Sequence, residues 1–385
     1  MIFLFASIGP ISSMLYLPSL PSIANTFHVS ISLSQLTITL FVFGYSIARL
    51  FFSTMSDAFG RKALLVIGLV VSLIGSIICF SSETIIVLLI GRFLQGLGAG
   101  GSNILARIIL RDTIPNNNLA KYLSYYSMVN ISSLVFSPLL GGYIQYYAGW
   151  RASFITLIVL NGLALIICIK SLPETNLYRK TSKINLSIVV LNLRKLLTNQ
   201  AFIFYAVLLI LGYGNLMAWL TSGPILLQNI LLLTPVQFGW CAVIIGAFSF
   251  SGAYLNSILV TKYGVLKMLK IGVLLLFCAG LVMLIPVSFN KLTITSIMLP
   301  AAIAAFGVSL IIPNAYAAGL IGCSDFVGIA VAILSFLQIM GGVLSSLIIS
   351  ITLGNNQVPL GLVFLISGIL GIIIMFFLQK INSSL

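Results

Sequence analysis

The chain has 385 residues, of which 60% are hydrophobic and only 6% are charged. This composition excludes a soluble fold, because a soluble protein must cover its surface with polar side chains. Together with a mean hydropathy of +1.20, it predicts a helical protein that crosses a membrane many times. Nineteen Lys and Arg stand against five Asp and Glu. We expect this basic excess to meet acidic lipid headgroups rather than nucleic acid.

The few reactive side chains give no sign of enzymatic chemistry. The five cysteines lack CxxC spacing, which indicates neither a disulfide framework nor a metal site, and we expect no cofactor. No nucleophile or pair of carboxylates is placed for catalysis within an apolar segment, so we expect no enzyme. The start of the chain has no charged segment before its apolar run, and we therefore expect no cleavable signal peptide.

The apolar segments predict twelve membrane-spanning helices. A helix needs about 20 mostly apolar residues to cross a bilayer, because lipid offers no partner to an unpaired backbone amide. The stretches between Lys195 and Lys262 and between Asp325 and Lys380 hold no charge, and each has room for two helices and a turn. The predicted helices cover residues 2–24, 34–55, 63–81, 85–107, 121–144, 151–170, 200–225, 236–259, 268–288, 293–316, 327–352 and 359–379.

One long polar stretch, rich in basic residues, divides these helices into two groups of six. We therefore predict an N-terminal bundle over 1–170, a basic linker over 171–199 and a C-terminal bundle over 200–385. Most basic residues fall on the side of the membrane that holds the linker and both termini. By the positive-inside rule this side is the cytoplasm.

An internal repeat supports the division into halves. Shifting the first half by 204 positions pairs Gly60 with Gly264 and Gly68 with Gly272, and a shift of 211 pairs Asn103 with Asn314. Shared membrane composition is the alternative explanation of these matches. Two six-helix halves related by an axis along the membrane normal are a known transporter arrangement, with the substrate site between them near mid-membrane.

Three segments carry a resemblance to the major facilitator superfamily. Residues 53–62, STMSDAFGRK, resemble the motif G-x-L-x-D-R-x-G-R-K between helices 2 and 3. Residues 92–100, RFLQGLGAG, resemble the helix 4 motif R-x-x-Q-G-x-G, and residues 137–142, SPLLGG, resemble the helix 5 motif G-P-x-x-G-G. Gly60 suits a tight turn, and Asp57 can cap a helix or pair near Arg61.

A finer resemblance is to the Bcr/CflA drug-resistance subfamily. It rests on Tyr16-Leu17-Pro18, Gly149-Trp150-Arg151 and Pro313-Asn314-Ala315, among other segments spread over most of the chain. The resemblance implies a twelve-helix exporter of the bacterial inner membrane. We expect a monomer, because a monomer suits two halves that enclose one cavity. The implied transport is alternating access driven by proton antiport, with substrates such as bicyclomycin or chloramphenicol-like compounds.

One departure from the subfamily bears on coupling. The subfamily usually carries an Asp just before the Tyr-Leu-Pro segment, where this chain has Met14. A carboxylate there would be the natural proton carrier. Three interpretations remain: proton coupling through an end carboxylate such as Asp57 or Asp112, facilitated movement without coupling, or a weakly active transporter.

The candidate residues fall into two groups. Arg92 lies about seven residues inside helix 4, so roughly 10 Å deep, where it either bonds carbonyls of helix 1 and holds the bundle together or faces the cavity and favours an anionic or carbonyl-rich substrate. The other substrate or coupling candidates are Met14, Tyr16, Gln95, Trp219, Asn314 and Gln338. The gating and motif candidates are Asp57, Gly60, Arg61, Lys62, Arg107, Arg111, Asp112, Pro138, Gly141 and Gly142.

Three functions compete at this point. The first is a drug or metabolite exporter, and the second is a facilitator or importer of a small metabolite, which the absence of a carboxylate at Met14 would suit. The third is a receptor or membrane enzyme, against which the short loops argue, because they leave no soluble domain for signalling.

Overall fold

The computed structural model describes residues 1–175, 195–196, 198–289, 292–321, 327–352 and 356–383 of the chain. Twelve of the described helical segments are long and apolar enough to cross a membrane. This number and the all-helical fold confirm the prediction from the sequence. The chain forms two compact units, Met1–Lys183 with Leu233–Val243, and Ile184–Leu232 with Ile244–Leu385. The linker predicted at 171–199 falls mainly outside the described residues, so its boundaries stay a prediction.

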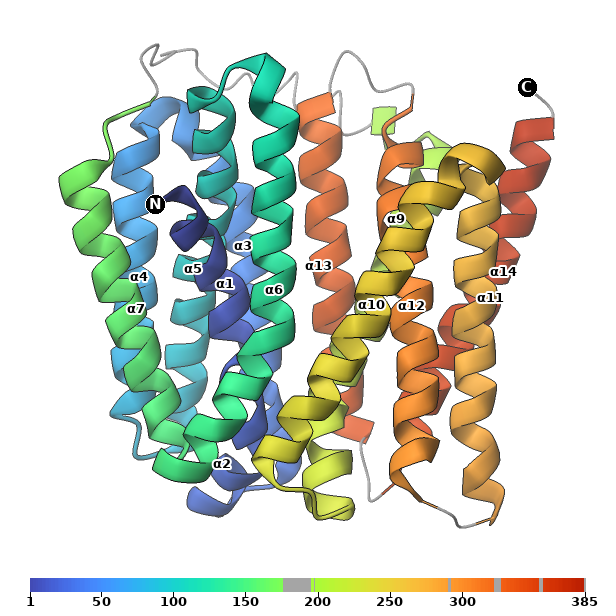
Figure 1. Cartoon of the computed structure of the whole chain (residues 1–385), viewed down its shortest axis with the longest axis horizontal. Helices are drawn as coiled ribbons and strands as arrows, with labels where there is room; N and C mark the ends of the chain where they lie inside the picture. The colour runs from blue at the N-terminus through green and yellow to red at the C-terminus, as the bar shows by residue number, and fades with distance from the viewer. Residues whose placement is uncertain (176–194, 197, 290–291, 322–326, 353–355, 384–385) are drawn as a thin grey trace. The chain divides into compact units, whose positions relative to one another are not determined.

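Six of the candidate spans among the described residues lie in the first unit, and Figure 1 draws them in blue to green. Its elements are α1 (Ile2–Met14), η1 (Leu17–Ser19), α2 (Leu20–Thr26), α3 (Ile31–Phe59), α4 (Arg61–Phe80), α5 (Ile85–Thr113), α6 (Asn116–Ala148) and α7 (Trp150–Ser171). Helix α5 packs against α1, α3 and α4, while α7 packs on α4. Because α5 packs against three other helices, it forms the centre of this unit.

The first span is broken, whereas the sequence predicted one helix over 2–24. Helix α1 ends at Met14, and a short 3-10 turn precedes α2. Pro18 explains the break, because it has no N–H to donate to the Met14 carbonyl and its ring collides with the preceding turn. Tyr16 lies at the break, where its backbone has φ −92° and ψ −5° and precedes the 3-10 turn. Its side chain is fully buried.

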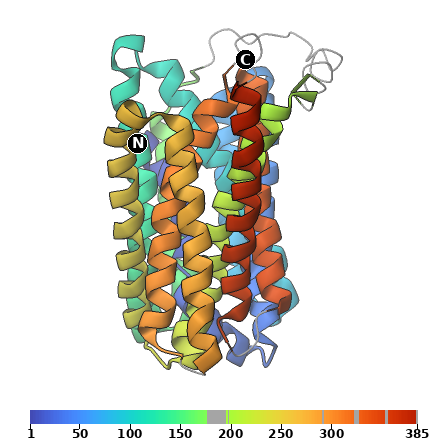
Figure 2. The same ribbon diagram turned by 90° about the vertical axis from the view of Figure 1, so that its right-hand side faces the viewer.

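The second unit holds the remaining spans. Its elements are α9 (Gln200–Pro224), the π-helical turn η2 (Ile225–Ile230), α10 (Pro235–Tyr263), α11 (Val265–Leu284), η3 (Ile285–Phe289), α12 (Ile294–Gly319), α13 (Val327–Thr352) and α14 (Val358–Ser383). The first residues of α10 belong to the first unit. Helix α11 packs against α12 and α14, which face the viewer in orange and red in Figure 2. Helix α9 packs against α13 and α12.

Close approach between helices is built on glycine. A Cβ on Gly68 of α4 would lie 3.1 Å from the Gly98 carbonyl oxygen of α5, and a Cβ on Gly272 of α11 would lie 2.8 Å from the Gly307 carbonyl oxygen of α12. Small residues at such crossings let two helix backbones come together, which is how spans associate in lipid. Gly68 and Gly272 are also one of the predicted repeat pairs.

The outer faces are apolar, as lipid contact requires. Helix α7 buries Phe154, Leu157 and Ala164 against its neighbours. Its opposite face exposes large apolar side chains at helical spacing, namely Ile155, Val159, Leu163 and Ile166. A helix that is hydrophobic on both faces suits a bilayer and not water.

Candidate functional site

Arg92 is the central feature of the first unit. Helix α5 begins after Thr84, whose hydroxyl accepts a hydrogen bond from the Val87 amide at 3.4 Å. This start places Arg92 two turns inside the helix, where its side chain is 0% exposed. Burying a guanidinium costs several kcal/mol unless acceptors surround it. The surroundings of Arg92 therefore decide what the site can do.

One nitrogen of Arg92 is well satisfied. Nη1 donates to the Ser12 carbonyl oxygen of α1 at 3.1 Å and also to the side-chain oxygen of Gln95. Gln95 in turn donates from Nε2 to the Ser76 hydroxyl of α4 at 2.7 Å. These bonds join α5 to α1 and α4, which includes the bond to a helix 1 carbonyl that one of the two predicted roles of Arg92 requires.

Two aromatic rings flank the same guanidinium. Its carbon Cζ lies 3.9 Å from the centre of the Tyr16 ring and 4.2 Å from the centre of the Phe41 ring. A cation over an aromatic face is stabilised by about 2 kcal/mol where water is excluded. The Tyr16 hydroxyl is 3.0 Å from the hydroxyl of Thr37, which fixes the ring in place.

The remaining nitrogens of Arg92 are not satisfied. Neither Nε nor Nη2 has a hydrogen-bond partner among the described residues. A buried donor without an acceptor costs about 1–3 kcal/mol, and more when it is charged. The cavity-facing role of Arg92 stays a prediction, because the side chain is fully buried and none of the residues that line the described pocket is Arg92.

Met14, the position of the expected carboxylate, is 3% exposed at the end of α1. The five carboxylates of the chain are Asp57, Glu83, Asp112, Glu174 and Asp325. None of them lies in the middle of a described span: Asp57, Glu83 and Glu174 stand outside the spans, Asp112 is next to the end of its own, and Asp325 is outside the described residues. Arg92, the most deeply placed charged residue of α5, therefore has no carboxylate near it in the middle of a described span.

The charged residues near the start of α4 form a second cluster in the first unit. Arg61 donates from Nε to the Asp112 carboxylate at 3.0 Å and from Nη1 to the Ser56 hydroxyl at 2.7 Å. Glu174, just after α7, accepts hydrogen bonds from the Arg61 and Lys62 amides at 2.9 and 3.3 Å. Its carboxylate thereby caps α4 at the positive end of the helix dipole.

Two of the gating candidates from the sequence, Arg61 and Asp112, pair in this second cluster. Arg107 and Arg111 are both exposed on the same helix as Asp112. The side chain of Asp57 is outside the described part of the chain. Gly60 has φ 95° between α3 and α4, as the predicted tight turn requires.

The helix 5 motif lies at tight backbone contacts. Pro138 and Gly141 are buried in α6, and a Cβ on Gly141 would lie 1.7 Å from the Leu15 carbonyl oxygen. A Cβ on Gly142 would lie 2.4 Å from the Pro235 carbonyl oxygen. Only glycine fits at either place, so these two motif residues have a packing role.

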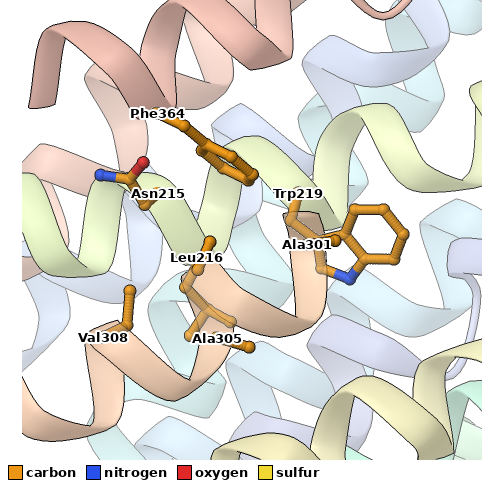
Figure 3. A pocket seen from close by; sticks show the side chains of 8 residues that line it. Asn215, Leu216, Trp219, Ala301, Ala305, Val308 and Phe364 are labelled. Carbon is orange, nitrogen blue, oxygen red and sulfur yellow. The ribbon is translucent and has the colours of Figure 1, made fainter. Parts of the chain in front are cut away.

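The candidates in the second unit have different neighbours. Trp219 lines a small pocket between α9, α12 and α14, together with Asn215 and Phe364 (Figure 3). The free volume of this pocket is about 10 Å³, the lower limit for a single water. Asn314 instead donates to Asn256 of α10 at 2.6 Å, and Gln338 of α13 is half-buried and absent from the pocket lining.

Several contact residues had not been singled out from the sequence. The 3-residue spacing of Arg92 and Gln95 could have indicated their pairing on one helix face. No sequence spacing indicated the contacts of Arg92 with Ser12, Phe41 and Ser76, because these residues lie on helices other than α5.

Comparison with known proteins places the chain in a family. The family model described as Major Facilitator Superfamily matches residues 2–323. An uncharacterized MFS-type transporter, YdgK of Bacillus subtilis, is 26% identical over 98% of this chain and 94% of its own length. A bicyclomycin resistance protein homolog of Haemophilus influenzae is 26% identical over 90% of this chain and 87% of its own. Multidrug resistance protein D of Escherichia coli is 24% identical over 96% of this chain and 92% of its own length.

A solved structure agrees in fold. The xylose transporter XylE of E. coli, in a partially occluded inward-open conformation, superposes with a TM-score of 0.73 over 98% of this chain and 97% of its own, at 15% identity. At this identity the likeness shows the fold alone. The match of the family model over most of the chain shows more: this chain belongs to the major facilitator superfamily, a family of membrane transporters and not of enzymes.

Proposed function

We propose that the chain exports drugs across the bacterial inner membrane by alternating access and proton antiport, with both termini in the cytoplasm. The observation that carries this proposal is the similarity, over nine-tenths of the chain or more, to proteins named for bicyclomycin and multidrug resistance. The Bcr/CflA motifs agree with it. The orientation follows from the side on which the basic residues gather.

A second candidate function rests on Met14. Its apolar side chain occupies the position where the subfamily usually has a carboxylate, and no carboxylate of the chain lies in the middle of a described span. Without a membrane-embedded acid, a transporter has no obvious group to load and release a proton. An uncoupled facilitator or importer of a small metabolite is the alternative that this observation favours.

A resistance assay separates the two. The native protein, Met14→Asp and the uncharged isostere Met14→Asn are expressed in a host that lacks its own pumps, and tolerance to chloramphenicol and bicyclomycin is measured with and without a protonophore. Export by antiport predicts resistance that the protonophore abolishes. Resistance from Met14→Asp alone would favour the uncoupled protein. If none of the three gives resistance, the drug-export proposal is wrong.

The direction of transport needs a separate measurement. Everted membrane vesicles expose the cytoplasmic face, so an exporter accumulates drug inside them when a proton gradient is imposed. Equal movement in both directions, unaffected by the gradient, is the result expected of a facilitator.

A further inference from the structure

The unsatisfied nitrogens of Arg92 lie together on one edge of its guanidinium group. Nη1 makes both of the hydrogen bonds to protein oxygens, whereas Nε and Nη2 make none to the described residues. In an arginine side chain, the N–H bonds of Nε and Nη2 point the same way, like two prongs of a fork. This spacing matches the two oxygens of a carboxylate, which binds such an edge in the plane of the group.

The described part of the protein does not balance this charge. The buried guanidinium is a cation. Phe41 stabilises the cation by its ring face, and Tyr16 does so by its ring face and its neutral hydroxyl. Neither side chain carries a negative charge. The carboxylates that the structure describes are engaged or exposed: Asp112 pairs with Arg61, Glu174 caps α4, and Glu83 lies in a loop.

We propose that the Nε–Nη2 edge of Arg92 binds the carboxylate of a transported organic acid. The proposal rests on the transport function proposed above and adds a substrate class to it. Tyr16 and Phe41 flank the guanidinium, and their rings suit an acid with an aromatic or other apolar body. Burial of the edge makes the site selective, because a carboxylate supplies both the two acceptors and the missing negative charge.

A buried water is the competing occupant. Water could accept one of the hydrogen bonds, yet it would leave the positive charge of Arg92 uncompensated. Benzoate and benzamide separate the two cases, because they have the same shape and differ in charge. Formate tests whether a free small anion takes the place of an organic acid.

The experiment measures binding of these three compounds to the purified full chain in lipid nanodiscs by titration calorimetry. We expect benzoate to bind at least tenfold more tightly than benzamide, and more tightly than formate. Arg92→Lys keeps the charge and loses the fork, and should weaken benzoate binding about tenfold or more. Arg92→Gln should abolish it.

A matched control removes another cation of the same unit. Arg49 of α3 is half-buried, and its Cζ lies 5.8 Å from the Tyr45 ring. Arg49→Gln should leave the preference for benzoate over benzamide unchanged. If Arg92→Gln does not fold, Arg92→Lys carries the test.

Several results would overturn the proposal. They are equal binding of benzoate and benzamide, binding of formate but not benzoate, and undiminished benzoate binding by Arg92→Lys or Arg92→Gln. These results are independent of drug export. Drug resistance without any preference for benzoate would contradict the carboxylate site and leave the drug-export proposal standing. Arg92-dependent benzoate binding without drug resistance would support the carboxylate site and contradict the drug-export proposal.

Discussion

The guanidinium carbon of Arg92 lies 3.9 Å from the centre of the Tyr16 ring, and this contact joins the fourth span to the break in the first. Tyr16 is held on its other side by Thr37 of α3. The residue at the interruption of the first span is thus also one that stabilises the buried cation.

Changes at Tyr16 should separate its ring from its hydroxyl. Tyr16→Phe keeps the ring over Arg92 and loses the bond to Thr37, which we expect to cost about 1 kcal/mol. Tyr16→Leu also removes the cation–π contact, for a further loss of about 2 kcal/mol. Unfolding of the purified variants in mixed micelles at increasing SDS measures both. Equal stability of the Phe and Leu variants would show that the ring contact contributes nothing.

Gly141 should tolerate no side chain. A Cβ there would lie 1.7 Å from the Leu15 carbonyl oxygen, and helix backbones cannot move apart without loss of their packing. We expect Gly141→Ala to reduce sharply the yield of monodisperse protein in size-exclusion chromatography. Gly162→Ala in α7 is the control, because a Cβ there has no atom within 4 Å. Similar yields from both variants would contradict the tight approach of α6 to the break after α1.

The Glu174 cap should contribute through both hydrogen bonds and charge. Glu174→Gln retains an acceptor oxygen and loses the charge at the helix end, for a cost of about 0.3–1 kcal/mol. Glu174→Ala loses both and should cost about 1–2 kcal/mol. The measurement is the apparent melting temperature, at low and high salt. A Gln variant less stable than the Ala variant would argue against the cap.

Asn314 and Asn256 should be coupled. Their bond links α12 to α10 at 2.6 Å, and a hydrogen bond between spans contributes on average about 0.6 kcal/mol and at most about 1.7. A double-mutant cycle with Asn314→Ala and Asn256→Ala should return a coupling energy in that range. Strict additivity of the two losses would mean that the bond is not formed in the membrane.

The glycine turns and the helix positions could be predicted from the sequence. Gly60 and Gly264 were paired as a repeat, and the structure gives them φ 95° and φ 80° at the same kind of helix junction, α3 to α4 and α10 to α11. Span length, charge and turn residues are local signals. They are therefore enough to predict twelve helices with ends a few residues from those observed.

The contacts of the candidate site were harder to predict. Glu174 lies 113 residues from the amide of Arg61 that it caps, and no spacing rule connects positions so far apart. The end of α1 at Met14 was not predicted, because the apolar run continues through Pro18. The pairing of Arg61 with Asp112 was missed for the same reason as the cap, since the helices that carry them meet only in the folded chain.

The position of Glu174 limits where this transporter can be divided into separately expressed halves. Its carboxylate follows the last residue of α7 by three positions and secures the first turn of α4. A first half that stops at Leu172 would contain all the helices from α1 to α7. It would still lack the carboxylate of Glu174 that caps α4. A cut placed after Thr175 keeps Glu174 in the same half as the helix that it caps.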